Sequence, residues 1–203
     1  MTEERSQTIE TYRTKAGEFA EYFSLFPHRA QEVARGFSFL AKKNPKTVEL
    51  GVGTGGDTGE ILQHTDDYVG VDFVTELLAY AREKHPGTRF VEADITEWEI
   101  PQGTEMVFGF ATLLHLNQEE VADLFRRMHS RLAPGAVIYL SLKYGRYRGF
   151  MKNDRFGVRE FYLYTPHLLK KLIGARYSIF YAGRLDKSTD PWIMVGIRKK
   201  NVK

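Results

Sequence analysis

Residues 47–60 read TVELGVGTGGDTGE, a short run of strand-forming residues that leads straight into a glycine-rich loop. The loop satisfies the pattern GxGxxG through Gly51, Gly53 and Gly56, and it satisfies GxGxG through Gly51, Gly53 and Gly55. Glycine is needed where a strand turns sharply into a helix and where a cofactor approaches the backbone closely. The order of strand, glycine loop and helix predicts an α/β protein with a nucleotide-like cofactor at the loop.

Strands and helices alternate on the C-terminal side of this stretch, which predicts a doubly wound, mostly parallel sheet that ends in an antiparallel hairpin. On its N-terminal side, residues 8–43 carry apolar residues at helical spacing with a break at Pro27, so we expect two or three helices there. Residues 143–165 are basic and aromatic, and we expect a loop. The expected strands cover residues 68–72, 88–94, 106–110, 136–142, 177–183 and 192–199, and the expected helices cover residues 76–85, 118–132 and 166–175.

The composition suits one domain that needs neither disulfides nor a structural metal. The chain has 203 residues, of which 42% are hydrophobic and 27% charged, and it has no cysteine. We expect a single domain over residues 1–203, with a helical cap at 1–44 and an α/β core at 45–203. No apolar run approaches the roughly 18 residues of a membrane span, and the charged start MTEERSQTIE does not resemble a secretory signal, so we expect a cytoplasmic location. The net charge of +3 permits an anionic partner without specifying nucleic acid.

The charges around the glycine loop distinguish between two classes of cofactor. A dinucleotide places a pyrophosphate at the start of the helix, where amide donors and the helix dipole attract anions. The loop has no Lys or Arg, whereas Glu49 precedes it and Asp57 stands where the helix should begin. Two carboxylates disfavour a pyrophosphate but tolerate a sulfonium and an α-amino group. A cofactor with a cationic sulfonium therefore fits this loop better than a dinucleotide does.

Acidic residues also follow the next two strands. Asp72 closes the strand YVGVD, where its carboxylate can accept hydrogen bonds from both ribose hydroxyls of a cofactor. Asp94 follows the third strand, where it can accept from an adenine amino group while Ile95 or Phe73 packs on the ring. Both acids have structural alternatives, because Asp72 could cap the helix that begins near Thr75 and Asp94 could cap a short turn. Together with the glycine loop, they predict one crevice at the carboxyl ends of the strands.

The chain resembles class I S-adenosylmethionine-dependent methyltransferases in four successive stretches, VELGVGTGGDT, YVGVD, EADITEW and FATLLHL, within residues 45–142. Further along, SLKYG, VREFYLYT and DPWIMV are similar to a little-characterised group of small bacterial methyltransferases. The resemblance implies a Rossmann-like, seven-stranded sheet, with S-adenosylmethionine as the cofactor and S-adenosylhomocysteine as its product.

The resemblance also implies roles for individual residues. It implies ribose contacts from Asp72, adenine contacts near Asp94 and Ile95, and a methionine moiety over the glycine loop. Tyr12, in the helical cap, would reach the methionine end, although packing within the cap is its structural alternative. Glu49 stands where the family more commonly has Asp. The predicted cofactor-binding set is Tyr12, Glu49, Gly51, Gly53, Gly55, Asp72, Phe73, Asp94, Ile95 and Phe110.

The catalytic and acceptor-binding candidates lie beyond the fourth and fifth strands. Methyl transfer is a direct displacement at the sulfonium methyl, so alignment of the reactants matters most and a base is optional. His115 is the first candidate for a base and Tyr144 the second, although His115 could instead be a packed structural histidine. Lys143 and Arg159 belong to a basic stretch that we expect to bind an anionic acceptor, although such stretches are often simply solvated.

The sequence excludes some acceptors more readily than it selects one. Without cysteine, C5-methylation of pyrimidines through a cysteine adduct is excluded. FATLLHL stands where amino-group nucleic-acid methyltransferases carry an Asn-Pro-Pro-Tyr type segment, and no target-recognition domain is present, so DNA is not expected. We predict a small, anionic acceptor, with RNA as the alternative substrate and a non-catalytic cofactor-binding module or a dinucleotide oxidoreductase as alternative classes. No metal and no membrane partner are predicted, and the oligomeric state stays open.

Overall fold

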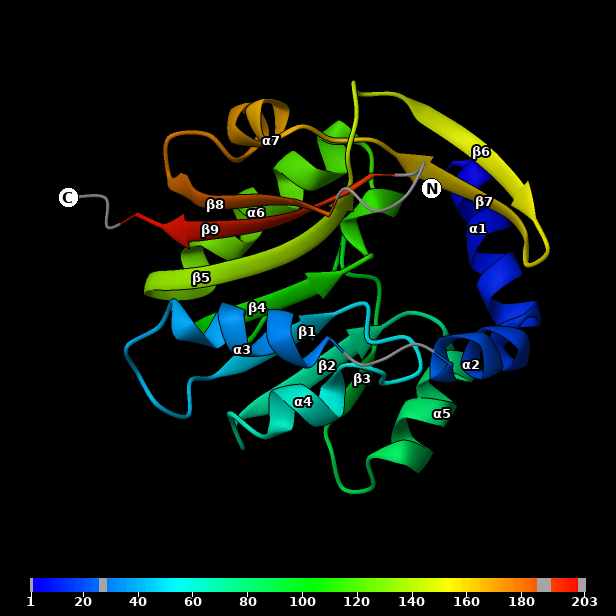
Figure 1. The fold of residues 1–203 in the computed structure, drawn as a ribbon, viewed down its shortest axis with the longest axis horizontal. Helices are drawn as coiled ribbons and strands as arrows, with labels where there is room; N and C mark the ends of the chain where they lie inside the picture. Colours follow the sequence, from blue (N-terminus) through cyan, green and yellow to red (C-terminus); the bar gives the residue numbers. More distant parts are fainter. Residues whose placement is uncertain (1, 26–28, 186–190, 201–203) are drawn as a thin grey trace.

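The computed structural model describes residues 2–25, 29–185 and 191–200, and a seven-stranded sheet forms its centre (Figure 1). The strand order is β3-β2-β1-β4-β5-β9-β8, in which β1 to β5 are parallel and β9 is antiparallel to both β5 and β8. This confirms the predicted mostly parallel, Rossmann-like sheet with its antiparallel hairpin. The strands are β1 (Thr47–Leu50), β2 (Tyr68–Asp72), β3 (Phe90–Glu92), β4 (Thr104–Phe110), β5 (Leu132–Lys143), β8 (Tyr177–Leu185) and β9 (Trp192–Lys199).

Helices cover both faces of the sheet. Side chains alternate between the two faces along each strand, so each face presents apolar residues against which helices pack. On β4, Met106 and Phe108 pack with Val33 of α3, whereas Val107 packs with Leu124 of α6. Asn117 and Glu120 form a capping box that starts α6. The helices are α1 (Glu3–Thr14), α2 (Ala16–Ser24), α3 (Ala30–Ser38), α4 (Thr58–Leu62), α5 (Thr75–Lys84), α6 (Gln118–Arg131) and α7 (Pro166–Ile173), with a 3-10 turn η1 (Leu113–His115).

The segment that we expected to be a loop contains a β-hairpin. Strands β6 (Gly149–Asp154) and β7 (Gly157–Tyr162) pair antiparallel in a second, two-stranded sheet. The prediction of a loop over 143–165 was therefore wrong. The alternation along β7 was hidden in the sequence because one of its two buried positions is occupied by a cation, Arg159, and the other by Phe161. The first helix also begins earlier than expected, at Glu3.

The helices α1 and α2 and the hairpin β6–β7 lie together beyond the carboxyl ends of the parallel strands, and we call them the roof (Figure 1). Two hydrogen bonds join α1 to β7: Thr11 Oγ1 donates to the Val158 carbonyl at 2.7 Å, and the Glu160 amide donates to Thr8 Oγ1 at 2.8 Å. The roof therefore combines the N-terminal helices with a segment that follows β5. No helix in the described part of the chain is long and apolar enough to cross a membrane.

Candidate cofactor and acceptor site

The glycine loop turns at left-handed backbone angles, with φ of 69° at Gly51, 55° at Gly53 and 71° at Gly55. Two of these glycines have different surroundings. A Cβ on Gly51 would lie 2.1 Å from Thr112 Oγ1, so tight packing against the end of β4 requires glycine there. A Cβ on Gly53 would meet nothing within 4 Å. Gly53 therefore presents its backbone to open space, as a cofactor-binding loop requires.

Beneath the loop, Glu49 is buried at the end of β1. Its Oε2 accepts hydrogen bonds from Tyr68 and, at 2.9 Å, from Thr58. Burial, reinforced by the nearby charge of Asp57, raises the pKa of Glu49 to about 8. The side chain is thus mainly protonated at neutral pH until a cation comes close enough to favour its charged form.

Arg29, which the sequence analysis missed, brings a cation to the loop. Asp57 occupies the N-cap position of α4 but makes no side-chain cap bond. It accepts instead from Arg29 Nη1 at 2.5 Å and from the Arg29 amide at 3.2 Å. The Arg29 guanidinium also lies 5.4 Å from the ring centroid of the buried Phe110. Arg29 lies 28 positions from Asp57 in the sequence, so it is not among the charged residues next to the loop that the sequence argument considered.

Asp72 connects the second strand end to the loop. Its Oδ2 accepts from the Gly53 amide at 2.8 Å and its Oδ1 accepts from the Val74 amide at 3.0 Å. Burial raises the pKa of Asp72, while these amides act in the opposite direction. The residue is not the N-cap of α5, because Val74 holds that position without a side-chain cap bond. Neighbouring Phe73 packs toward the aromatic cluster of the roof.

Asp94 is held by the roof through Arg5, a second residue that the sequence analysis missed. Arg5 Nη2 lies 2.7 Å from Asp94 Oδ1 and 2.8 Å from Oδ2, and Arg5 Nη1 donates to Glu120 at 2.7 Å. Ile95 is buried beside this pair. Arg5, Thr8 and Tyr12 stand at positions i, i+3 and i+7 of α1 and therefore share one face of the helix. This spacing is the signal in the sequence that could have identified Arg5.

His115 and Tyr12 meet across the crevice. His115 Nδ1 lies 2.6 Å from the Glu160 carbonyl, which can only accept, so Nδ1 carries the proton. His115 Nε2 is then the acceptor for the Tyr12 hydroxyl at 3.0 Å. Burial lowers the pKa of His115 to about 4, helped by the charges of Arg159, Lys143 and Arg5. The ring is therefore neutral, with both nitrogens engaged.

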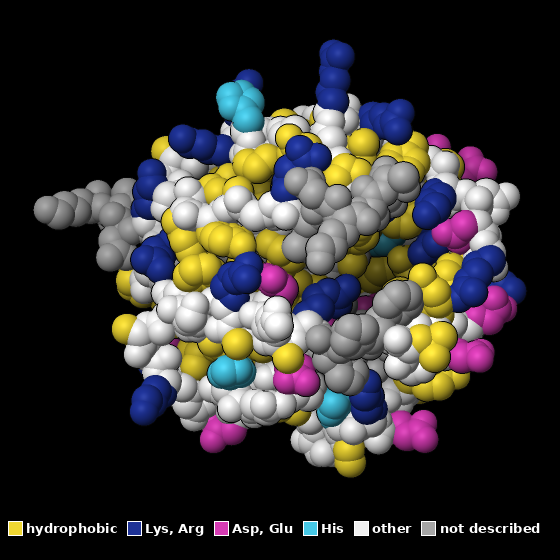
Figure 2. All heavy atoms as spheres, in the orientation of Figure 1, with side chains coloured by type: hydrophobic (Ala, Val, Ile, Leu, Met, Phe, Trp, Pro, Cys, Tyr) yellow, Lys and Arg dark blue, Asp and Glu magenta, His cyan; other side chains and the backbone are white. Residues whose placement is uncertain are grey.

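The two predicted acceptor-binding cations are buried rather than displayed on a solvated loop. Arg159 Nη2 contacts the Asp154 carboxylate at 2.7 and 2.9 Å, and its guanidinium lies among the rings of Tyr12, Phe19, Phe156 and Phe161. Lys143 Nζ lies 4.9 Å from the Trp192 ring centroid. Tyr144, the second candidate for a base, stacks with Arg184, whose guanidinium carbon lies 4.5 Å from the ring centroid. In the view of Figure 2 the surface is hollowed near its middle, and hydrophobic and basic side chains gather around the hollow.

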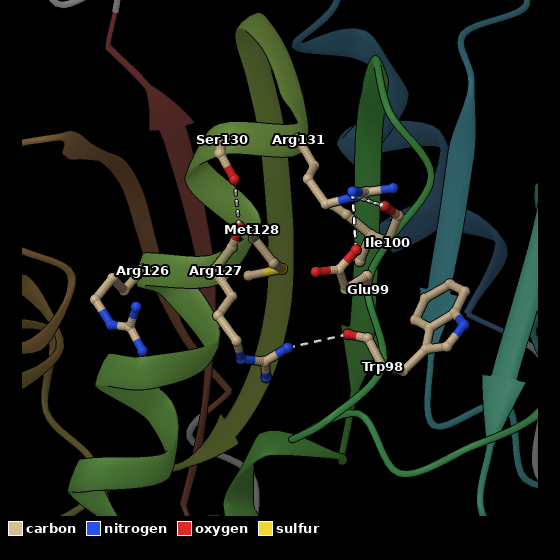
Figure 3. Close-up of a pocket in the computed structure, with 8 residues that line it drawn as sticks. All are labelled: Trp98, Glu99, Ile100, Arg126, Arg127, Met128, Ser130 and Arg131. Carbon is tan, nitrogen blue, oxygen red and sulfur yellow. Dashed lines mark hydrogen bonds and ion pairs between the residues drawn. The ribbon is translucent and has the colours of Figure 1, made fainter.

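A separate cavity of about 200 Å³ lies between α6 and the segment that precedes β4 (Figure 3). Its arginines already have partners: Arg127 Nη1 donates to the Trp98 carbonyl at 3.0 Å, and Arg131 Nη1 donates to Glu99 at 2.9 Å. These contacts attach α6 to the preceding segment. The cavity therefore belongs to the scaffold and not to the site at the strand ends.

Comparison with known proteins agrees with this geometry. A family profile described as a methyltransferase domain matches residues 48–135. Trans-aconitate 2-methyltransferase of Rhizobium leguminosarum bv. trifolii is 32% identical over 103 residues, which is 50% of this chain and 40% of that protein. The corresponding enzyme of Escherichia coli O1:K1 / APEC is 32% identical over 126 residues, 59% of this chain and 49% of its own. The chain thus spans less than half the length of these curated relatives.

Among solved structures, the 1,6-didemethyltoxoflavin-N1-methyltransferase of Burkholderia thailandensis superposes with a TM-score of 0.77 at 16% identity. The match covers 97% of this chain and 88% of that one. At this identity the likeness establishes the fold, and the profile and the curated relatives add the sequence evidence. Residues 48–135 thus match the methyltransferase-domain family, and the chain has the fold of S-adenosylmethionine-dependent methyltransferases.

Proposed function

We propose that this chain binds S-adenosylmethionine at the strand ends and transfers its methyl group to a small anionic molecule, with release of S-adenosylhomocysteine. The observation that carries the proposal is the hydrogen bond from the Gly53 amide to Asp72. It brings the open glycine loop and the second strand end together in one crevice. The trans-aconitate and toxoflavin enzymes named above act on small molecules by their names, which supports the same class of acceptor.

The residues at the strand ends fit the donor. Asp72 Oδ2 accepts from the Gly53 amide and Oδ1 accepts from the Val74 amide, and the remaining lone pairs of the carboxylate would accept from the ribose hydroxyls. Asp94 Oδ2 accepts one hydrogen bond from Arg5 and would accept a second one from an adenine amino group beside Ile95. The open space at Gly53 suits the methionine moiety, and Phe73 and Phe110 would pack around it. When bound, the cofactor supplies an electrophilic methyl group on a sulfonium.

Charge supports the assignment of the methionine end. Glu49, whose pKa is raised by burial, would become ionised beside the α-amino group of the cofactor. Arg29, held by Asp57, would face the carboxylate of the same moiety. Tyr12 in the roof would lie above this end, and the remaining loop glycines, Gly51 and Gly55, would shape the turn that receives it.

The glycine loop and the acids at the strand ends form the floor of the site. The acceptor would lie between this floor and the roof. Arg159 and Lys143 place two buried cations among aromatic rings at the roof, which suits a compact anion with an apolar body. RNA would instead have to bind exposed residues of the segment that precedes the hairpin, such as Arg146 and Arg148. A steep loss of substrate affinity with salt would favour that alternative, because several phosphate contacts would be screened.

Calorimetry tests the proposal directly. S-adenosylhomocysteine should bind the wild-type chain and NAD should not. Asp72→Ala should weaken S-adenosylhomocysteine binding by about 1–3 kcal/mol, as expected for lost hydrogen bonds to a charged group. Asp67→Ala, which changes an exposed acid just before β2, is the matched control and should bind normally. Preferential binding of NAD, or equal affinities of the two variants with intact circular dichroism, would overturn the proposal.

A further inference from the structure

We propose that His85 is a positioning residue of the cofactor site, which holds the second half of the glycine loop in place from the end of α5. The inference rests on the proposed function and deepens it, because it concerns a residue that would act on the cofactor through the loop backbone. His85 is the C-cap residue of α5 and is followed by Pro86. Three features of its surroundings carry the inference.

The first feature is a hydrogen bond that reaches the loop from another element. His85 Nε2 lies 2.8 Å from the Gly55 carbonyl oxygen, which can only accept, so Nε2 carries the proton and donates it. The Gly53 amide, two residues earlier, donates to Asp72 at the end of β2. The loop is thus attached to β2 through Gly53 and to α5 through Gly55.

The second feature is that two glycines make room for the imidazole. A Cβ on Gly55 would lie 3.0 Å from His85 Cδ2 and 3.2 Å from Ala81 Cα. A Cβ on Gly59 would lie 3.2 Å from His85 Cε1. Gly59 belongs to α4, where glycine is less favourable than alanine. The packing of His85 gives a physical reason for glycine at this helical position.

The third feature is the direction of the next backbone amide. The described peptide bonds are all trans, so the Gly55 carbonyl and the Gly56 amide point in opposite directions across their shared peptide unit. Because His85 binds the carbonyl, the Gly56 amide points away from His85. This amide has no hydrogen-bond acceptor among the described residues, and a Cβ on Gly56 would meet nothing within 4 Å. His85 therefore fixes the direction of a free donor in an open part of the loop.

A fixed, free donor suits the proposed ligand. Backbone amides in such turns bind anionic groups, and the carboxylate of the methionine moiety is the anionic group of S-adenosylmethionine. A loop that is already held in its bound shape also loses less conformational freedom on binding. His85 would therefore strengthen cofactor binding without touching the cofactor.

Calorimetry with S-adenosylhomocysteine tests the inference. His85→Ala should weaken binding by about fivefold to thirtyfold, as expected for the loss of one hydrogen bond. His85→Gln, whose side-chain amide nitrogen can replace Nε2 as the donor, should bind within about threefold of the wild type. His129→Ala is the matched control and should bind normally. His129 is also partly buried, lies in the last turn of α6, and has no hydrogen-bond partner for Nε2 among the described residues.

Gly59→Ala separates positioning from a merely structural role. The new Cβ should displace the imidazole and weaken binding by about threefold to tenfold, a usual coupling between neighbouring residues. In a His85→Ala background the same substitution should leave the affinity unchanged, because no imidazole is left to displace. Nitrogen NMR of the cofactor-free chain should show the Gly56 amide signal shifted in His85→Ala and in Gly59→Ala, and unshifted in His129→Ala.

The outcomes distinguish this inference from the proposed function. Circular dichroism would first establish that each variant is folded. Wild-type affinity in His85→Ala, equal losses in His85→Ala and His85→Gln, or an equal effect of Gly59→Ala in both backgrounds would overturn the role of His85 while cofactor binding stands. A wild-type chain that does not bind S-adenosylhomocysteine would overturn the proposed function itself.

Discussion

The floor of the site and its roof are built in opposite ways. The floor consists of the glycine loop and the acids at the strand ends, and its central bond joins Gly53 to Asp72 across 19 positions of sequence. The roof is held by pairs separated by far more: 89 positions for Arg5 and Asp94, 103 for Tyr12 and His115, and 152 for Thr8 and Glu160. Short-range order shapes the floor, whereas the roof exists only once the whole chain has folded.

The two regions also differ in charge. The floor presents Glu49, Asp72 and Asp94, while the roof buries Arg159 and, beside it, Lys143. Under the proposed function, a cationic donor would lie on an acidic floor and an anionic acceptor beneath a basic roof. Each half would then bind one reactant by charge, and transfer would remove the positive charge of the sulfonium. The following experiments challenge this contrast.

The largest effect is expected at the floor, from Gly53→Val. Gly53 and Gly103 both have positive φ, and a Cβ on either would meet nothing within 4 Å. A β-branched residue should therefore strain both sites by about 1–2 kcal/mol. Only Gly53→Val should also lose S-adenosylhomocysteine affinity, by roughly a hundredfold or about 3 kcal/mol, because its side chain would occupy cofactor space. Calorimetry would measure the S-adenosylhomocysteine affinity of both variants, and urea unfolding would measure their stability. Equal affinities would mean that Gly53 does not border the cofactor and would remove the contrast.

The next effect concerns pH, which should act on the two regions with opposite signs. The pKa of Glu49 is raised to about 8 in the fold, so its contribution to stability is present at low pH and is lost as pH rises from about 4.5 to 8. The pKa of His115 is lowered to about 4, so its contribution is present above about 6.5 and is lost as pH falls toward 4.

Urea unfolding of the cofactor-free chain at several pH values would separate these limbs. Between about pH 4.5 and 6.5 the two contributions oppose each other, so Glu49→Gln should remove a decline of up to roughly 1.4 kcal/mol per pH unit and expose the rise in stability that is due to His115. His115→Gln should remove that rise and expose the decline that is due to Glu49. Curves that run parallel to the wild type for both variants would mean that neither group carries its shifted pKa in solution.

The smallest effect is expected from removal of the link between α1 and the floor. Arg5 is 12% exposed and contacts two carboxylates, whereas Arg13 on the same helix is 51% exposed, with its acids at 3.6 and 3.9 Å. Arg5→Ala should lower the free energy of unfolding by about 1–2 kcal/mol, and Arg13→Ala by less than about 0.5 kcal/mol. Hydrogen exchange should also show faster opening of α1 in Arg5→Ala. Identical exchange in both variants would mean that the roof is held by packing alone.

The same contrast explains what could be predicted from the sequence. The floor was accessible because strand, loop and helix signals are local, so the sheet and the positions of Glu49, Asp72 and Asp94 at strand ends followed from spacing. The roof was not. The hairpin resembled a loop because its buried face includes Arg159, and the role of Arg5 depends on a partner in a distant strand end. The predicted roles of individual residues in ligand binding and in catalysis stay predictions.

The composition of the roof has a consequence for synthesis on the ribosome. The nascent α1 leaves the exit tunnel long before Glu160, its partner 152 positions later, has been translated. At about 5–20 residues per second, the delay is on the order of ten seconds. The sequence of α1, EERSQTIETYRT, is largely polar, so this segment can stay hydrated until its partner has been synthesised. The more apolar α2, with Phe23 and Tyr22 near its end, is the segment for which a chaperone would have most use during that interval.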